Sequence, residues 1–286
     1  MKQTYSHNLI ASFVEYLDHS ICNKGSGFTN INVDFYKTSD SRLTGYAIYA
    51  APYKQFVSNA AVSGAVVPSG ISGVNGFISR NVSGLNISWN QGRAVFSGSI
   101  NNLTSLSGRF SIKDFNIHYS AEPEESIIFD TKWKINNPII PQTSISGLAE
   151  NEKSYPAIYV KYYPHENTPF EFGGGESTDA MFRCIVVSDN QFKLDGANNV
   201  IQNLARSYFG YLYSHEIPYN FLGDIKSGTQ YNYTGITTPK VGRDIIYINK
   251  VYITPLNERI SENFSPNVYI SLADVEIKAY RNPRAE

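Results

Sequence analysis

Acidic residues and glycines that could support catalysis gather in one stretch of the chain, between residues 155 and 212. Four carboxylates flank three consecutive glycines there: Glu166, Glu171, Gly173–Gly175, Glu176 and Asp179. Two carboxylates on either side of a sugar would suit glycoside hydrolysis, one as general acid and one as nucleophile or base. All four fall in a polar segment between two β-like runs, so we favour a solvated loop over a hydrolase site.

The glycine run Gly173–Gly175 also invites comparison with a phosphate-binding loop. A P-loop carries the pattern G-x-x-x-x-G-K-[ST] and leads directly into a helix. Here Glu176 and Ser177 follow the glycines and open a β-like run. The sequence therefore predicts a hairpin loop, because glycine tolerates the backbone conformations that tight turns need.

Other reactive residue types are scattered along the chain. The five histidines show no metal-ligand spacing: His7, His19, His118, His165 and His215. Cys22 and Cys184 each stand in an apolar pattern, which is typical of buried thiols. No G-x-S-x-G motif is present. We therefore predict a protein that is not an enzyme, with no catalytic residues, no cofactor and no metal.

The composition indicates a weakly charged protein that is rich in tyrosine. Charged residues make up 17% of the 286 residues and the net charge is -1, which gives no electrostatic signal for nucleic-acid binding. The 21 tyrosines offer large contact areas at little cost in side-chain entropy, as protein interfaces require. No apolar run reaches the roughly 20 residues of a membrane span. The first 20 residues lack the apolar stretch of a signal peptide, so we expect folding in a cytosol without membrane contact.

The N-terminal part predicts a helix followed by a strand. Apolar residues at steps of three and four indicate an amphipathic helix over Ser6–Lys24: Ile10, Phe13, Val14, Leu17 and Ile21. Gly25 and Gly27 should end it. From Phe28 to Tyr36 apolar and polar residues alternate, which predicts a half-buried strand.

Residues 43–149 have a different character. Short β-prone runs stand between Gly, Ser and Asn residues: 46–50, 65–67, 85–89, 94–96, 109–112 and 116–119. Leu85–Trp89 and Ala94–Phe96 flank the turn residues Asn90-Gln91-Gly92, which predicts a β-hairpin. This spacing is typical of a sandwich or barrel of short strands, here inserted into or appended to another domain.

The chain after residue 150 alternates strands with a helix. Ile158–Tyr163 predicts a strand that Pro164 should end, because proline donates no ladder hydrogen bond. Thr178–Val187 is apolar on both faces, which indicates a central strand. A helical stripe of apolar residues then runs from Leu194 to Leu212, with Asp195 near its start.

The C-terminal part predicts a long polar loop and two more strands. Residues 213–243 form the loop, and Asp244–Ile253 is the first strand. In the run Val268–Ala279 the apolar alternation changes parity at Ala273-Asp274, which predicts a β-bulge. The fold class is therefore α+β: a small mixed sheet with two packing helices, built from residues 1–42 and 150–286, carrying a β-rich, sandwich- or barrel-like insertion over residues 43–149.

The order of elements outside the insertion resembles the tail-terminator or tail-completion proteins of tailed bacteriophages. The local match is the Gly-rich turn, strand and helix of residues 171–204, with Asp195 to Leu204 in the helix. The hairpin is similar to those of phage neck and connector proteins, with matches at Trp89, Asn90, Gly92, Val95 and Phe96. Two departures are the long insertion and the tryptophan at position 89, where tyrosine is usual.

The resemblance implies a structural virion protein, assembled in the host cytoplasm. Such proteins form rings, typically hexameric, that cap the tail tube and join it to the neck. The implied partners are further copies of the chain and the tube, sheath and neck or connector proteins. Loops 164–177 and 213–243 and exposed strand edges would supply the contacts. The candidate interface residues are Tyr163, Phe172, Gly173, Gly174, Gly175, Glu176, Tyr208, Tyr211, Tyr213 and Tyr219.

Two alternatives stay open. The Tyr-dense segments 155–163 and 208–219 suit either an interface or a core. The β-rich insertion could instead be a carbohydrate-binding or adhesion module, with Trp89 and Trp133 as platforms for stacking sugars, although buried core positions are the commoner role of tryptophan.

Overall fold

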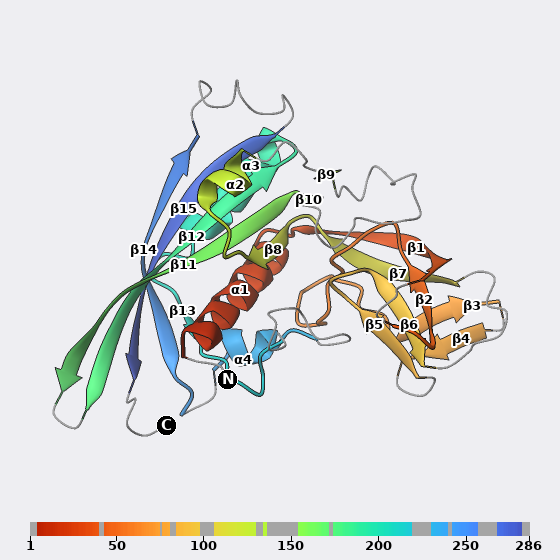
Figure 1. The fold of residues 1–286 in the computed structure, drawn as a ribbon, viewed down its shortest axis with the longest axis horizontal. Helices are drawn as coiled ribbons and strands as arrows, with labels where there is room; N and C mark the ends of the chain where they lie inside the picture. The colour runs from red at the N-terminus through yellow and green to blue at the C-terminus, as the bar shows by residue number, and fades with distance from the viewer. Residues whose placement is uncertain are drawn as a thin grey trace.

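The protein is built on two β-sheets that lie on either side of the long helix α1 (Figure 1). The computed structural model describes residues 5–39, 43–74, 76–80, 84–97, 106–129, 134–135, 154–171, 174–218, 230–239, 242–256 and 268–281. One sheet has seven strands and the other has six, and a two-stranded ladder pairs β9 (Lys134–Ile135) with β10 (Ser154–Tyr155). The structure is α+β, with more strand than the sequence predicted.

Helix α1 (Tyr5–Lys24) confirms the predicted N-terminal helix. It ends where predicted, because the Gly25 and Gly27 amides donate to carbonyls of its last turn. Its burial exceeds that of an amphipathic surface helix, since even Glu15 and Asp18 are buried. The helix is therefore enclosed on the side that the sequence predicted to face solvent.

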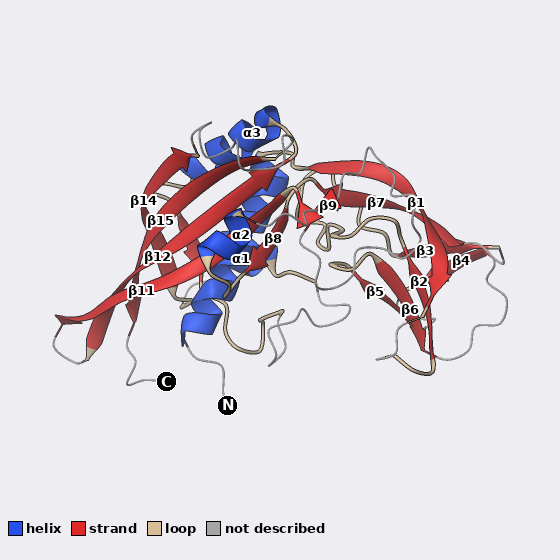
Figure 2. Ribbon diagram, turned by 45° about the horizontal axis from the view of Figure 1, so that its top comes forward, coloured by secondary structure: helices blue, strands red, loops and turns tan. Residues whose placement is uncertain are grey.

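The seven-stranded sheet is antiparallel at every pairing, in the order β4-β3-β7-β1-β2-β6-β5. Its strands are β1 (Phe28–Thr38), β2 (Tyr46–Ala50), β3 (Gly70–Gly73), β4 (Gly76–Ser79), β5 (Leu85–Ser88), β6 (Arg93–Ser97) and β7 (Leu106–Lys113). The first part of β1 pairs with β7 and its last residues pair with β2. The strands of this sheet curl (Figure 2). They enclose an aromatic core that includes Phe35, Phe56, Trp89 and Phe110.

Most short strands predicted in this region are present. The predicted hairpin is confirmed as β5 and β6, and Gly92 in its turn adopts a φ of 62°. A side chain there would also clash, because a Cβ on Gly92 would lie 1.9 Å from the Tyr53 carbonyl oxygen. The run 65–67 is not a strand, so that prediction was wrong.

The six-stranded sheet is mixed, as predicted, in the order β13-β14-β15-β12-β11-β8. Its strands are β8 (Asn116–Tyr119), β11 (Ala157–Glu171), β12 (Gly175–Ser188), β13 (Tyr208–Gly210), β14 (Ile245–Pro255) and β15 (Tyr269–Arg281). The pair β8–β11 is parallel and the others are antiparallel. The predicted division of the chain assigns β1 to the sheet with two helices and β8 to the insertion, whereas β1 pairs in the seven-stranded sheet and β8 in the six-stranded one.

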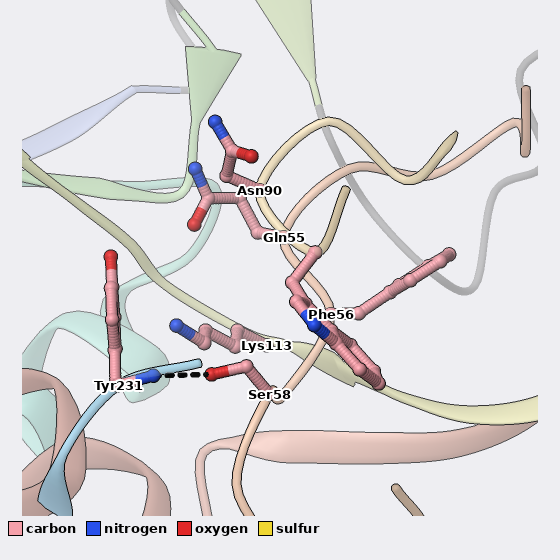
Figure 3. Close-up of a pocket in the computed structure, with 7 residues that line it drawn as sticks. Gln55, Phe56, Ser58, Asn90, Lys113 and Tyr231 are labelled. Carbon is pink, nitrogen blue, oxygen red and sulfur yellow. Dashed lines mark hydrogen bonds between the residues drawn. The ribbon is translucent and has the colours of Figure 1, made fainter. Parts of the chain in front are cut away.

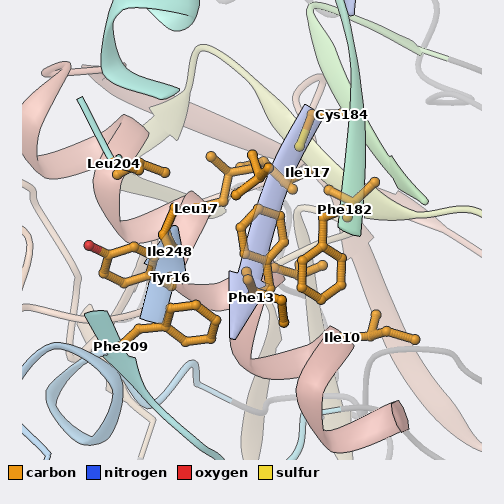
Figure 4. Close-up of a cluster of buried hydrophobic side chains, with 14 of the residues drawn as sticks. Ile10, Phe13, Tyr16, Leu17, Ile117, Phe182, Cys184, Leu204, Phe209 and Ile248 are labelled. Atoms are coloured by element: carbon orange, nitrogen blue, oxygen red, sulfur yellow. The ribbon is translucent and has the colours of Figure 1, made fainter. Parts of the chain in front are cut away.

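Two helices pack on one face of the six-stranded sheet, α1 and α3 (Gln191–Gln202). The rings of Phe13 on α1 and Phe182 on β12 stack with their centroids 4.1 Å apart (Figure 4). Side chains on the other face of β12, Ile185 and Val187, pack beneath the short helix α2 (Glu124–Ile128). Strand β12 lies between β15 and β11, the central position that its sequence predicted, and near Ile185 and Val187 it is buried on both faces.

Three boundaries around this sheet differ from the predictions. Strand β11 does not end at Pro164 but continues to Glu171, because a register shift between Pro164 and Glu166 accommodates the proline. Most of the predicted loop 164–177 is thus the extended hairpin β11–β12. Helix α3 begins at Gln191, earlier than the predicted start near Asp195, and the Asn190 side chain caps it. It ends at Gln202, well before Leu212.

The parity change in the last strand has a different cause from the predicted bulge. The register between β15 and β12 is continuous from Arg281 to Tyr269. Val268 and Ile270 face the core beneath α2, whereas Val275 and Ile277 face α1 and α3. The apolar phase changes because each half of β15 buries the opposite face. The register shift between β15 and its other neighbour lies in β14, between Ile248 and Lys250.

Candidate functional site: the open face of the six-stranded sheet

One face of the six-stranded sheet is covered by helices and most of the other is accessible. On the accessible side, α2 covers only the end near Ile185, Val187 and Ile270. We call the remainder of that side the open face; it carries Tyr163, Asp179, Arg183, Tyr208, Tyr247, Lys250, Tyr252, Asp274, Glu276, Lys278 and Tyr280. These residues are brought together from five strands, so the face exists only in the folded chain.

A row of side chains crosses the open face near the outer edge strand. Tyr208 on β13 lies opposite Tyr247, which lies opposite Lys278, which in turn lies opposite Asp179. The two tyrosine rings are 6.5 Å apart, and Lys278 Nζ lies 3.8 Å from an Asp179 carboxylate oxygen. Cross-strand neighbours on one face are close enough for such contacts, so the row follows from the register.

A second row is organised by Arg183 on β12. Its guanidinium donates to both carboxylate oxygens of Asp274, at 2.6 and 2.8 Å, and to Glu124 of α2 at 3.2 Å. The Tyr163 hydroxyl also donates a hydrogen bond to the Glu124 carboxylate. Burial, together with this bond, raises the pKa of Tyr163 to about 12. The fork geometry of arginine fixes these groups in place. Tyr252 lies opposite Asp274 at the end of the same row.

The ion pairs of this face position side chains more than they stabilise the fold, because exposed pairs contribute about 0–1 kcal/mol each. The tyrosines supply the accessible area: Tyr208, Tyr247, Tyr252 and Tyr280 are 53%, 48%, 50% and 41% exposed. Tyrosine is enriched at protein interfaces, because its ring gives a large contact area at little cost in side-chain entropy.

The predicted interface residues are distributed over several places in the fold. Tyr163 and Tyr208 lie on the open face. Tyr211 is buried and stacks on Tyr5 with centroids 5.2 Å apart, so the structure places it in the core. Tyr213 is half-buried, with the Arg243 guanidinium 5.5 Å from its ring centre.

The predicted glycine loop is the turn of the β11–β12 hairpin. Gly174 has a φ of 92°, which suits glycine, and Gly175 and Glu176 begin β12. Phe172, Gly173 and Tyr219 lie outside the described residues. The structure therefore places Gly174–Glu176 apart from Tyr208 of β13 and does not form one cluster from the predicted set.

Sequence reasoning missed Tyr247, Tyr252, Lys278 and Tyr280. Tyr247 and Tyr252 are five residues apart, so simple alternation would place them on opposite faces. The register shift in β14 puts both on the open face. One signal could have identified two of these residues. Apolar and polar residues alternate along β15 after Asp274, and this alternation places Lys278 and Tyr280 on the same face of the sheet.

The carboxylates considered for glycoside hydrolysis lie on the hairpin. Glu166 and Asp179 face each other across β11 and β12, and both are accessible to solvent. Asp179 interacts with Lys278, and Glu176 lies opposite Pro169 and Arg281. Exposed, partly neutralised carboxylates lack the dry environment in which a catalytic pair is tuned.

A small cavity lies where the seven-stranded sheet meets the rest of the chain (Figure 3). It is lined by Gln55, Phe56, Ser58, Trp89, Asn90, Lys113 and Tyr231 and has room for about one water molecule. Trp89 is 4% exposed and packs in the aromatic core, so it offers no platform for a sugar. Trp133 lies outside the described residues.

In the ranges that the structure describes, no group of three or more His, Cys, Asp or Glu side chains is placed to hold a metal ion. None of the helices there combines the length and apolar character needed to cross a membrane. Cys22 and Cys184 are buried free thiols, and burial raises the pKa of each.

Protein-family models and curated sequences transfer no role to this chain. No protein-family model matches the chain, and no curated protein matches its sequence. The geometry of the open face is therefore the basis for a functional argument.

Proposed function

We propose that this protein is a structural component of a tailed-phage virion. In this proposal, copies of the chain assemble in the host cytoplasm into a ring, which caps the tail tube and joins it to the neck. The observation that carries the proposal is the open face, where four exposed tyrosines lie among paired charges. A monomeric enzyme has no need of such a surface, whereas a subunit that binds its neighbours does.

The edges of the same sheet support repeated association. Among the described residues, the outer side of β14 has a strand partner only at Ile245–Tyr247, and the outer side of β11 only at Ala157–Val160. Three antiparallel pairings separate β14 from β11, so these two edges run in opposite directions. A neighbouring copy could thus continue the sheet antiparallel, in the heterologous manner that generates rings.

The low charge of the chain is consistent with this proposal. With a net charge of -1, identical copies repel one another weakly when they pack closely. Contacts would depend on tyrosine rings, backbone edges and short-range ion pairs such as Lys278–Asp179. Tail tube, sheath and neck proteins would meet the remaining surfaces of the ring.

Sedimentation velocity of purified variants tests the role of the open face. The double variant Tyr247→Ser/Tyr252→Ser should sediment as a monomer under conditions in which the wild-type protein assembles. The matched control is Tyr36→Ser/Tyr46→Ser, which removes two tyrosines of similar exposure, 45% and 50%, from the seven-stranded sheet. Equal assembly of both double variants would contradict the assignment of the open face.

A further inference from the structure

A short segment connects the two sheets across helix α1. We call residues 230–239, which include α4 (Tyr233–Thr237), the strap. On one side the strap binds the segment that follows β2, where the Gln230 side chain donates to the Ser58 carbonyl at 2.6 Å. The Tyr231 backbone amide donates to the Ser58 hydroxyl at 3.2 Å (Figure 3). Asn59 donates to the Tyr231 carbonyl at 2.7 Å.

On its other side the strap binds two acids of α1. The Asn232 backbone N–H donates to Glu15 Oε2 at 2.7 Å, and the Tyr233 hydroxyl donates to the Asp18 carboxylate. Tyr233 is fully buried, next to Cys22 of α1 and to Val57 and Val62, which follow β2 in the chain. The strap therefore closes over α1 and holds the seven-stranded sheet against it.

The charges beneath the strap do not balance. Lys113, at the end of β7, lies 2.7 Å from Asp18, and both side chains are almost completely buried. Glu15 lies one turn earlier on α1, is also fully buried, and has no hydrogen-bond partner for Oε1 among the described residues. One lysine thus serves two buried carboxyl groups.

An ionised Glu15 is unfavourable in this position. Burial raises the pKa of Glu15 well above its ordinary value of 4.5, and the bond from Asn232 only partly opposes this. The negative charges of Asp18 and Glu216 raise the pKa further, while Lys113 lowers it. When the strap opens, water reaches the carboxyl group and this penalty is relieved.

We propose that Glu15 is a proton-controlled latch for the strap: the strap is closed firmly over the neutral carboxylic acid, and its closure weakens as the carboxylate forms with rising pH. The direction of this pH dependence follows from linkage. The Glu15 carboxyl group has a higher pKa in the closed state than in the open state, so closure is strongest at pH values below the open-state pKa. Closure then weakens between that value and the higher pKa of the closed state. This inference concerns the joint between the sheets and does not depend on the proposed virion role.

Other titratable groups near the strap act differently. Glu216 is held by Arg243 through bonds of 2.7 and 2.9 Å, and it accepts from the Asn232 side chain. His19 lies 5.2 Å from the Tyr233 ring, and burial lowers its pKa. A histidine that is harder to protonate in the closed state would weaken closure as pH falls, which is opposite in sign to Glu15.

Hydrogen exchange of the full chain, measured by mass spectrometry from about pH 5 to about pH 9, tests the latch. The wild-type protein is compared with Glu15→Gln at each pH, so that the intrinsic exchange rates cancel. Near pH 5 the strap should exchange at similar rates in both. At higher pH the wild-type strap should exchange faster, by up to about tenfold per pH unit until the closed-state pKa is passed.

Two internal controls separate the latch from other effects. Peptides from β14 should show no such change, and the exposed-site variant Glu166→Gln should behave like the wild type. A wild-type to Glu15→Gln ratio that is constant with pH would overturn the proposal, as would the same pH dependence in β14. If Glu15→Gln does not fold, the ratio of strap to β14 exchange within the wild type decides, since it should rise with pH.

Discussion

Replacing Lys113 by methionine probes the buried charge pair that joins α1 to the seven-stranded sheet. Lys113 Nζ lies 2.7 Å from Asp18 Oδ2, and the two side chains are 3% and 2% exposed. Methionine preserves the unbranched apolar stem but removes the cation. Asp18 would then remain in the interior as a carboxylate without a counter-ion.

The expected loss of unfolding free energy follows from this burial. Removing one partner of a buried pair costs about 3–5 kcal/mol, because the other charge is left uncompensated. Asp18 keeps the hydrogen bond from Tyr233, which places the loss at the lower end, about 3 kcal/mol. In the double variant Asp18→Asn/Lys113→Met neither charge remains, so we expect it to recover about 1–2 kcal/mol of that loss.

Urea unfolding provides the assay, followed by far-ultraviolet circular dichroism and by tryptophan fluorescence. Trp89 lines the same cavity as Lys113, so its emission reports on this joint. A loss of less than about 1 kcal/mol in Lys113→Met would show that removing the lysine leaves no uncompensated buried charge. A loss in the double variant equal to the full sum of the two single variants would show that the two residues are not coupled.

Two further predictions concern the cores and the hairpin. Phe13→Ala should cost about 3–5 kcal/mol in chemical unfolding, because it removes a fully buried ring, whereas Phe192→Ala, at an 89% exposed position, should be nearly neutral. Gly92→Ala should lower the melting temperature more than Gly45→Ala. Both glycines have positive φ, but a Cβ at Gly92 would lie 1.9 Å from the Tyr53 carbonyl oxygen and one at Gly45 meets nothing within 4 Å. Equal shifts in the glycine pair, or similar losses in the phenylalanine pair, would contradict these assignments.

Local signals in the sequence were sufficient for several elements. Helix α1 follows from the spacing of its apolar residues, and the β5–β6 hairpin follows from the turn at Gly92. These features depend on neighbouring residues, whose preferences are encoded within a few positions.

The open face could not be predicted, because it depends on long-range register. Tyr247 and Tyr252 share a face only through the shift in β14, and Arg183 meets Asp274 only after β12 and β15 pair. Tyr211 shows the converse, since its identity gave no indication that Tyr5 would stack on it in the core.

The buried acids of α1 were also beyond the sequence. On an amphipathic helix, Glu15 and Asp18 would face solvent, but the strap and β7 cover them. The segments that enclose them, near residues 113 and 232, lie far away in the chain. Only the folded structure therefore identifies Glu15 as an unbalanced buried acid.

Native mass spectrometry of the purified full chain, alone and mixed with isolated tail tubes, tests the central proposal most directly. We expect a closed ring with a mass that is a whole multiple of 32.0 kDa, and co-purification of that ring with the tube ends. A chain that stays monomeric at all concentrations and never associates with tail tubes would contradict it.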